Sequence, residues 1–179
     1  MSALPELTIA KVVQACGEIE GRVKLQKIVY LLSAMGYGLP FRDFQVRHYG
    51  PFSPRLAAAL DFLVQAGVVD EQPVEVGSEY PRFDYRATSR YSELLSAYVQ
   101  VTGPEDKPEL GKIASQLSQL DRATLEIAAT MCFLEHEEGC SPDVLRSELK
   151  ALKGHLPEFD AKVQESHELL NELGLPVSW

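Results

Sequence analysis

The spacing of apolar residues along the chain predicts mostly helices, interrupted by a few short strands. Apolar positions recur at helical spacing in four segments of the first hundred residues. These segments are residues 7–19, 22–35, 54–65 and 91–101. In the second segment the apolar side chains spread almost all round after Ile28, which predicts a central and largely buried helix.

Short alternating patterns lie between these helices. Residues 41–49 alternate in period two, which predicts a brief strand, and Gly50-Pro51 is predicted to turn the chain after it. Residues 68–69 and 82–88 are predicted to pair as a hairpin with a long tip. Ser53 followed by Pro54 is the pattern of a helix N-cap with proline in the first helical position.

The order of these elements is that of a winged helix, a variant of helix-turn-helix. We therefore predict a mainly α protein with a winged-helix-like N-terminal domain, residues 1–101, whose wing is a small β-hairpin. Residues 102–108 contain glycine, two prolines and charged residues, and are predicted to be a linker. Residues 109–179 are predicted to form a helical C-terminal extension, either separate from the first domain or packed with it as one unit.

The predicted C-terminal helices cover residues 110–120, 121–138, 141–152 and 158–173. The second carries one apolar stripe, formed by Leu125, Ala128, Ala129, Cys132 and Phe133, and the last carries another. Both stripes must be buried against the first domain or against a second subunit. A homodimer formed through these helices is therefore one alternative.

Composition narrows the classes of function. The 179 residues are 45% hydrophobic and carry a net charge of −9, which argues against a general nucleic-acid binder. Residues 1–60 nevertheless hold 7 basic and 4 acidic side chains, so any polyanion site must lie there. The three cysteines form no CxxC pair, and we find neither a signal peptide nor an apolar run long enough for a membrane span. These features predict a cytoplasmic protein.

No motif of catalysis or of cofactor binding is present. The chain lacks a nucleophile elbow, a phosphate loop, a dinucleotide fingerprint and a catalytic Cys–His pairing, so we expect a protein that is not an enzyme and carries no cofactor. Cys132, His136 and Cys140 are spaced four apart, but Cys132 falls in the apolar stripe and Cys140 follows a glycine. No metal site is therefore predicted.

Two sequence motifs carry a resemblance to a known family. Residues 24–30 (KLQKIVY) and 49–53 (YGPFS) resemble the Panacea domain group, which comprises SocA-like antitoxin domains and their uncharacterised YwgA-like relatives. Residues 66–69, 85–89 and, more loosely, 125–130 follow the same pattern. The resemblance implies toxin neutralisation by protein contact, with the toxin encoded next door. The long acidic helical C-terminal part departs from the antitoxin pattern and brings the chain closer to the YwgA-like branch.

The predicted third helix decides between protein contact and DNA contact. Its outward face carries Arg55, Ala58, Asp61, Phe62 and Gln65, whereas a helix that reads the major groove needs several basic or amide side chains. Acidic residues of the hairpin would also repel the DNA backbone. Phe62 is either an anchor for a protein partner or is covered by the C-terminal helices.

The segment from Arg47 to Arg55 gathers His48, Tyr49, Ser53 and two arginines beside a turn. These residues form either an anion or small-ligand site or a purely structural turn and helix cap. Lys24, Lys27 and Tyr30 reach a shared pocket with them if the predicted fold is right.

From these observations we predict an interaction or regulatory protein, antitoxin-like in acting through protein–protein contacts. The predicted interaction surface consists of Lys24, Lys27, Tyr30, His48, Tyr49, Arg55 and Phe62. Phe62 would be the anchor, and Arg55, Lys24 and Lys27 would supply charge complementarity. The alternative is a winged-helix transcriptional regulator that binds DNA through Arg47 and Arg55.

Overall fold

The computed structural model describes residues 4–77, 80–102 and 108–179. Within these ranges the protein is mainly helical and has two small antiparallel sheets. The elements up to residue 102 are α1 (Pro5–Cys16), β1 (Ile19–Glu20), α2 (Arg22–Ala34), β2 (Gln45–Arg47), β3 (Gly50–Phe52), α3 (Pro54–Gln65), β4 (Val69–Val74), β5 (Arg82–Ala87) and α4 (Arg90–Thr102). The later elements are α5 (Pro108–Ser118), α6 (Arg122–His136), α7 (Pro142–Lys153) and α8 (Phe159–Glu172).

Helix starts follow the predicted signals. Ser53 Oγ accepts the N–H of Leu56 at 3.0 Å, and Pro54 fills the first helical position of α3, where no N–H is needed. Ser141 and Pro142 begin α7 in the same order. Asp121, which was expected inside a helix, instead caps α6 by accepting the N–H of Thr124 at 3.0 Å.

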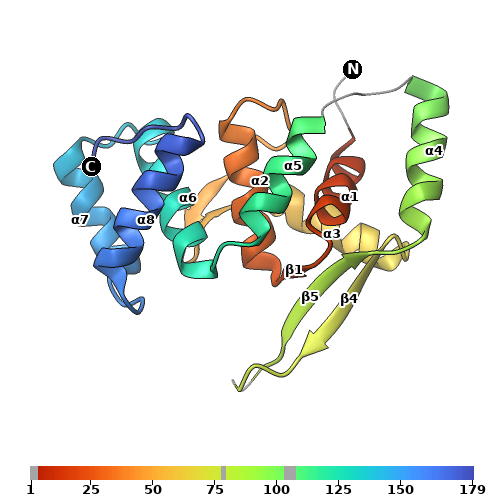
Figure 1. Cartoon of the computed structure of the whole chain (residues 1–179), viewed down its shortest axis with the longest axis horizontal. Coiled ribbons are helices and arrows are strands. Elements are labelled where there is room, and N and C mark those ends of the chain that lie inside the picture. Colours follow the sequence, from red (N-terminus) through yellow and green to blue (C-terminus); the bar gives the residue numbers. More distant parts are fainter. Residues whose placement is uncertain (1–3, 78–79, 103–107) are drawn as a thin grey trace.

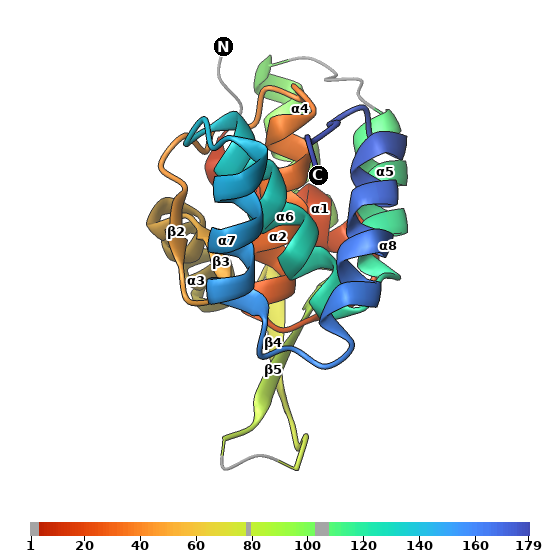
Figure 2. The same cartoon turned by 90° about the vertical axis from the view of Figure 1, so that its left-hand side faces the viewer.

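The predicted long-tipped hairpin is confirmed, and a third strand joins it. β4 and β5 pair antiparallel from Val69↔Ala87 to Val74↔Arg82. β1 lies on the other edge of β5 and gives the order β1-β5-β4. The prediction that the first helix continues to residue 19 is wrong, because the chain leaves the helix at Gly17 with a φ of +73°. The β4–β5 hairpin projects away from the helices (Figures 1 and 2).

The second sheet is the short hairpin β2–β3. Gln45 pairs with Phe52, Val46 with Pro51 and Arg47 with Gly50, so the turn lies at residues 48–49. Gly50-Pro51 was predicted to be the turn and is instead the start of the returning strand. The reason is the position of Gly50 against α6, described below.

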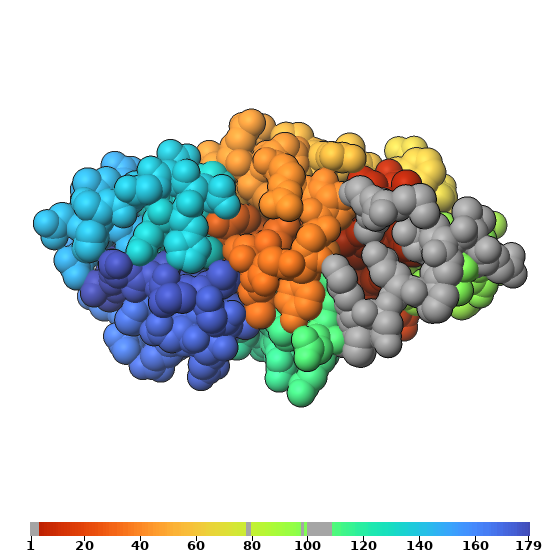
Figure 3. All heavy atoms as spheres, turned by 90° about the horizontal axis from the view of Figure 1, so that it is seen from above, coloured from red at the N-terminus to blue at the C-terminus, as the bar shows by residue number. Residues whose placement is uncertain are grey.

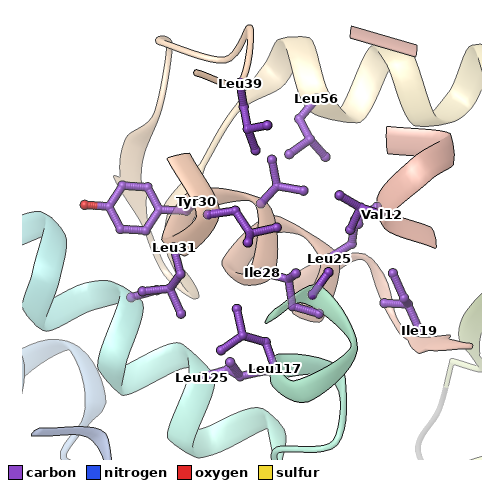
Figure 4. Close-up of a cluster of buried hydrophobic side chains, with 14 of the residues drawn as sticks. Val12, Ile19, Leu25, Ile28, Tyr30, Leu31, Leu39, Leu56, Leu117 and Leu125 are labelled. Carbon is purple, nitrogen blue, oxygen red and sulfur yellow. The ribbon is translucent and has the colours of Figure 1, made fainter. Parts of the chain in front are cut away.

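Helix α2 forms the centre of the protein, as its apolar pattern predicts. Residues 24–32 are all buried, and α2 packs against α1, α5, α6, β1 and β3. Figure 4 shows its side chains Leu25, Ile28 and Leu31 meeting Val12 of α1, Leu56 of α3, Leu117 of α5 and Leu125 of α6. Burial of each such side chain contributes about 1.5–3 kcal/mol. The first domain and the C-terminal helices thus share one hydrophobic core.

Helices α6, α7 and α8 lie at one end of the molecule, whereas α5 packs against α1 and α2 (Figure 1). α6 is buried along residues 124–134, and α8 packs on it through its predicted apolar stripe. Seen from above, the orange segment, which comprises most of α2 and the residues after it, lies between the blue C-terminal helices and the red α1 (Figure 3). The predicted linker covers residues 102–108. Residues 103–107 lie outside the described ranges, and the linker's two end residues belong to α4 and α5. In the described part of the chain, no helix combines the length and apolarity that a membrane crossing requires.

Candidate functional site

The two motifs that carry the family resemblance lie side by side. Gln26 of α2 donates from Nε2 to the Ser53 carbonyl at 3.0 Å and accepts the Ser53 N–H on Oε1 at 2.9 Å. Lys27 Nζ donates to the Pro51 carbonyl at 2.6 Å. β3 has no neighbouring strand on this side among the described elements. The Gln26 amide takes the place of one, because it both donates and accepts a hydrogen bond. The KLQK and GPFS segments therefore hold each other by buried polar contacts.

Asp43 completes this arrangement from the loop before β2. Its Oδ1 accepts the Ser53 hydroxyl at 2.6 Å, and its Oδ2 accepts the Arg55 N–H at 3.0 Å at the first turn of α3. Partial burial acts to raise the pKa of Asp43, but these two hydrogen bonds outweigh it and lower the pKa below its ordinary value. Asp43 thus stays charged and fixes the entry to α3.

A buried group of charges lies behind the hairpin. Glu126 of α6 binds Lys153 Nζ of α7 at 2.9 Å and Arg122 Nε at 2.5 Å. Lys153 Nζ also donates to the His48 carbonyl at 3.1 Å. Glu126 and Lys153 are both almost fully buried, so each depends on the other for compensation of its charge. These contacts attach the β2–β3 turn to the C-terminal helices.

The amine of Lys27 has an unusual protonation equilibrium. Burial lowers its pKa to about 7, because the charged form loses its hydration. The negative charge of Glu126 opposes this shift, while the positive charges of Lys153 and Arg122 add to it. Close to neutral pH a substantial part of Lys27 is therefore uncharged, unlike an ordinary lysine.

Gly50 sets the distance between the hairpin and α6. It adopts a φ of +86°, and a Cβ at this position would lie 2.4 Å from Thr130 Oγ1. No real Cβ approaches an oxygen so closely, so only glycine fits this place. The glycine of the YGPFS segment is explained by this contact rather than by a turn.

A pocket of about 320 Å³ opens between the start of α2 and the β2–β3 hairpin. Its rim is formed by the exposed residues Arg22, Arg47, His48 and Tyr49, and its floor by the buried side chains of Gln26 and Lys27. The segment that was predicted to be either a ligand site or a structural turn thus has features of both. Its backbone is held structurally, and its side chains surround a pocket.

The outward face of α3 is exposed to solvent, as the prediction of a protein-contact surface requires. Arg55, Ala58, Phe62 and Gln65 are exposed, and Phe62 is 58% exposed. α3 packs mainly against α1 and β4. The C-terminal helices therefore leave Phe62 uncovered, and the reading in which they bury it is wrong.

Basic side chains of β5 and of the start of α4 are engaged within the protein. Arg82 binds Asp84 at 2.7 Å, Arg86 binds Glu18 at 2.6 Å, and Arg90 donates to the Ala66 carbonyl at 2.8 Å.

Arg22, next to the sheet, binds Asp61 of α3 at 2.6 Å and Glu71 of β4 at 3.0 Å, and it donates to the Tyr85 hydroxyl at 2.7 Å. Asp61, predicted on the outward face, is therefore only partly exposed.

The predicted contact residues divide into two groups. Lys24, Lys27 and Tyr30 are 5%, 1% and 2% exposed, so the prediction that they form a contact surface is wrong. Helices α5 and α6 and strand β3 pack against α2. His48, Tyr49, Arg55 and Phe62 are exposed, and their role in binding a partner stays a prediction.

Tyr30 serves the core. Its hydroxyl donates to Cys132 Sγ at 3.7 Å, and its ring packs against Phe44 and Phe133. Burial and the neighbouring Cys132 raise the pKa of Tyr30 far above its ordinary value.

Cys132 Sγ also lies 3.6 Å from His136 Nδ1. The two side chains thus share one face of α6, as their spacing predicts. Among the described residues, no three His, Cys, Asp or Glu side chains gather as metal ligands would.

The buried pair Glu126–Lys153 was not predicted from the sequence. One signal was present: Lys153 continues the spacing of Leu145 and Leu149, the buried positions of α7. Glu126 stands inside an otherwise apolar stretch of α6, with Leu125 before it. A charged residue at a buried position requires a partner of opposite charge.

Comparison with known proteins supports part of the resemblance. The chain is 25% identical over 166 residues to the uncharacterised protein YwgA of Bacillus subtilis (strain 168). The match covers 92% of this chain and 93% of that protein, so it includes the helical C-terminal part as well as the first domain. No protein-family model matches the chain, and membership of the Panacea group stays a prediction from the motifs.

Proposed function

We propose that this protein is a non-enzymatic interaction or regulatory protein of the Panacea-like kind, which binds a protein partner through the outward face of α3. The observation that carries the proposal is the exposure of Phe62, 58% in a protein with a well-filled core. Full burial of a phenyl ring contributes about 1.5–3 kcal/mol, and a partner that covers the exposed part of Phe62 would recover the corresponding share of this free energy. The cytoplasm is the compartment we propose for this interaction.

The surroundings of Phe62 suit a protein partner. Ala58 and Gln65 lie one turn before and one turn after Phe62 on the same face. Arg55 lies at the N-terminal end of this face. A large apolar side chain among small and polar neighbours is the usual composition of an interface anchor and its rim. By analogy with the Panacea group, an antitoxin-like role is the form of the proposal to test first.

A winged-helix regulator is the second candidate. It is favoured by the order of α1, β1, α2, α3 and the projecting β4–β5 hairpin, which is that of winged helices, although β2 and β3 are inserted between α2 and α3. It is disfavoured by charge. Arg82, Arg86 and Arg90 are engaged within the protein, so few cations remain for DNA phosphates near α3 and the hairpin.

The test of protein contact uses two variants of similar chemistry. Phe62→Glu places a charge on the face of α3, and Val144→Glu does so at another exposed apolar side chain, on α7. The first partner to be tested is the product of the gene adjacent to its own. We expect Phe62→Glu to abolish co-purification, Val144→Glu to preserve it, and both to melt within about 2 °C of the wild type, as surface substitutions do.

Two results would refute this proposal. If both variants retain the partner, the face of α3 is not the interface. If Phe62→Glu unfolds the protein, the ring belongs to the core.

DNA binding is tested separately by fluorescence anisotropy with labelled mixed-sequence duplex at low and at physiological salt. Steeply salt-dependent binding that falls in Arg47→Ala and Arg55→Ala would favour the regulator.

A further inference from the structure

The wall of the pocket between α2 and the β2–β3 hairpin is mainly apolar, and the ionisable side chains that line it are basic. Arg22, Lys27 and Arg47 line it, together with His48, and no Asp or Glu is among its lining residues. This is unexpected in a chain with a net charge of −9. Glu126, whose charge acts on Lys27, is already held by Lys153 and Arg122.

Arg47 and Lys27 have no carboxylate partner within the described ranges, but burial keeps a substantial part of Lys27 uncharged close to neutral pH. Arg47 lies over the ring of Phe52 at 4.5 Å and forms no ion pair there. Lys27 donates to one acceptor, the Pro51 carbonyl, although an ammonium group carries three N–H donors. Arg22 differs, because Asp61 and Glu71 already neutralise it. The cation without a carboxylate partner, Arg47, therefore lies on the hairpin side of the pocket.

The remaining walls are flat and apolar. Val23 and the ring of Phe52 line the pocket, and the rings of His48 and Tyr49 meet edge to face at 4.8 Å between centroids. A volume of about 320 Å³ is at the lower end of small-molecule sites. The walls thus fit the body of a small planar molecule, and Arg47 fits an oxyanion attached to it.

We propose that this pocket binds a small planar ligand bearing an oxyanion, with Arg47 contacting the anion and Phe52 contacting the planar body. This site lies apart from the Phe62 position on α3 and goes beyond the proposed protein contact. Its ligand faces α2 and the hairpin, the two segments that hold each other through Gln26, Lys27 and Ser53.

The fixed backbone explains why the pocket is preformed. Lys153 holds the His48 carbonyl, Lys27 holds the Pro51 carbonyl and Gln26 holds Ser53 on both sides. A ligand therefore does not have to order the hairpin on binding, and little conformational entropy is lost.

The experiment compares acids with their neutral analogues. The probes are indole-3-acetate with indole-3-acetamide for a carboxylate, and adenosine 5′-monophosphate with adenosine for a phosphate. Binding is followed through the backbone amide resonances of residues 22–27, 47–50 and 52 in ¹H–¹⁵N spectra. We expect at least one acid to shift these resonances saturably and to bind about tenfold or more tightly than its neutral partner, the effect of one charge-assisted contact.

Variants locate the anion. Arg47→Glu is expected to weaken binding of the acid about tenfold or more. The control is Arg42→Glu, which makes the same change of charge at an exposed arginine of the preceding loop that does not line the pocket. Its effect on affinity is expected to be less than about twofold, because exposed charges at this range are screened by salt.

Three outcomes would overturn the proposal: neither acid shifting the resonances, acid and neutral analogue binding alike, or Arg42→Glu weakening binding as much as Arg47→Glu. None depends on the partner of α3, so the two proposals can fail independently.

Discussion

Replacing Gly50 by alanine tests how the β2–β3 hairpin lies on α6. The added Cβ would stand 2.4 Å from Thr130 Oγ1, at least 0.6 Å closer than the 3.0 Å limit of real Cβ contacts. Moving the Thr130 side chain away would break a hydrogen bond, because its hydroxyl donates to the Glu126 carbonyl at 2.6 Å. The hairpin in turn is held by Lys27 and so resists moving away.

The expected loss of stability has two parts. An L-residue at positive φ costs about 1–2 kcal/mol. Overpacking against a fixed neighbour adds about 1–3 kcal/mol. Gly50→Ala should therefore lower the free energy of unfolding by about 2–5 kcal/mol. In a chain of this size each kcal/mol corresponds to about 2–4 °C in Tm.

Gly17→Ala is the matched control. Gly17 has a φ of +73° and no atom within 4 Å of its Cβ position, so its substitution carries only the backbone part, about 1–2 kcal/mol. Urea denaturation followed by circular dichroism measures both variants. The entropy that alanine removes from the unfolded chain is the same in each and cancels in the comparison.

The double variant Gly50→Ala, Thr130→Ala isolates the contact. Removing the Thr130 hydroxyl removes the clash, so the double variant should be destabilised by less than the sum of the single variants, with a coupling of about 0.5–3 kcal/mol. If Gly50→Ala is no less stable than Gly17→Ala, or if the two substitutions are additive, the hairpin does not lie against α6 in the way described.

Three further predictions concern the buried titratable groups. Between pH 7 and 10.5 folded Lys27 binds fewer protons than the unfolded chain, so wild-type stability should rise with pH relative to Lys27→Met, by up to about 1.4 kcal/mol per pH unit. Urea denaturation from pH 6.5 to 9 measures this difference, and parallel curves would contradict it. Glu126→Gln leaves the ammonium of Lys153 buried without its carboxylate and should cost about 3–5 kcal/mol in the same assay. Adding Lys153→Met should recover part of this loss, and a double variant no more stable than Glu126→Gln would argue against the pair. Cys140 is partly exposed, so Ellman's reagent should modify it rapidly in the native protein. The other two thiols, whose pKa burial raises to about 11, should react only after unfolding, and a second rapid thiol would show that one of them is accessible.

Local signals in the sequence were sufficient for much of the fold. Helix starts at Ser53 and Ser141 depend on residues adjacent in the chain, and the exposed face of α3 follows from helical spacing alone. The β4–β5 hairpin likewise depends on two nearby alternating segments. Elements whose determinants lie within about ten residues could therefore be predicted.

The parts that could not be predicted depend on contacts between distant segments. Tyr30 is buried against Cys132, which is 102 positions away, and Lys153 meets the turn at His48 across 105 positions. A lysine at a helical position is ordinarily exposed, so nothing local distinguishes Lys27 from a surface residue. Gly50-Pro51 has the composition of a turn, and only the closeness of α6 makes it a strand.

The position of α2 at the centre has a consequence for synthesis on the ribosome. Its sides are covered by α5 and α6, which are translated later. The β2–β3 hairpin that α2 contacts also needs the hydrogen bond from Lys153 of α7, which is translated later still. A nascent chain that has emerged only to α4 therefore presents the apolar side chains of α2 to solvent and to chaperones. Cooperative folding therefore becomes favourable only once α7, with Lys153, has left the exit tunnel. A premature stop within the second half of the reading frame should thus yield an aggregation-prone fragment rather than a working first domain.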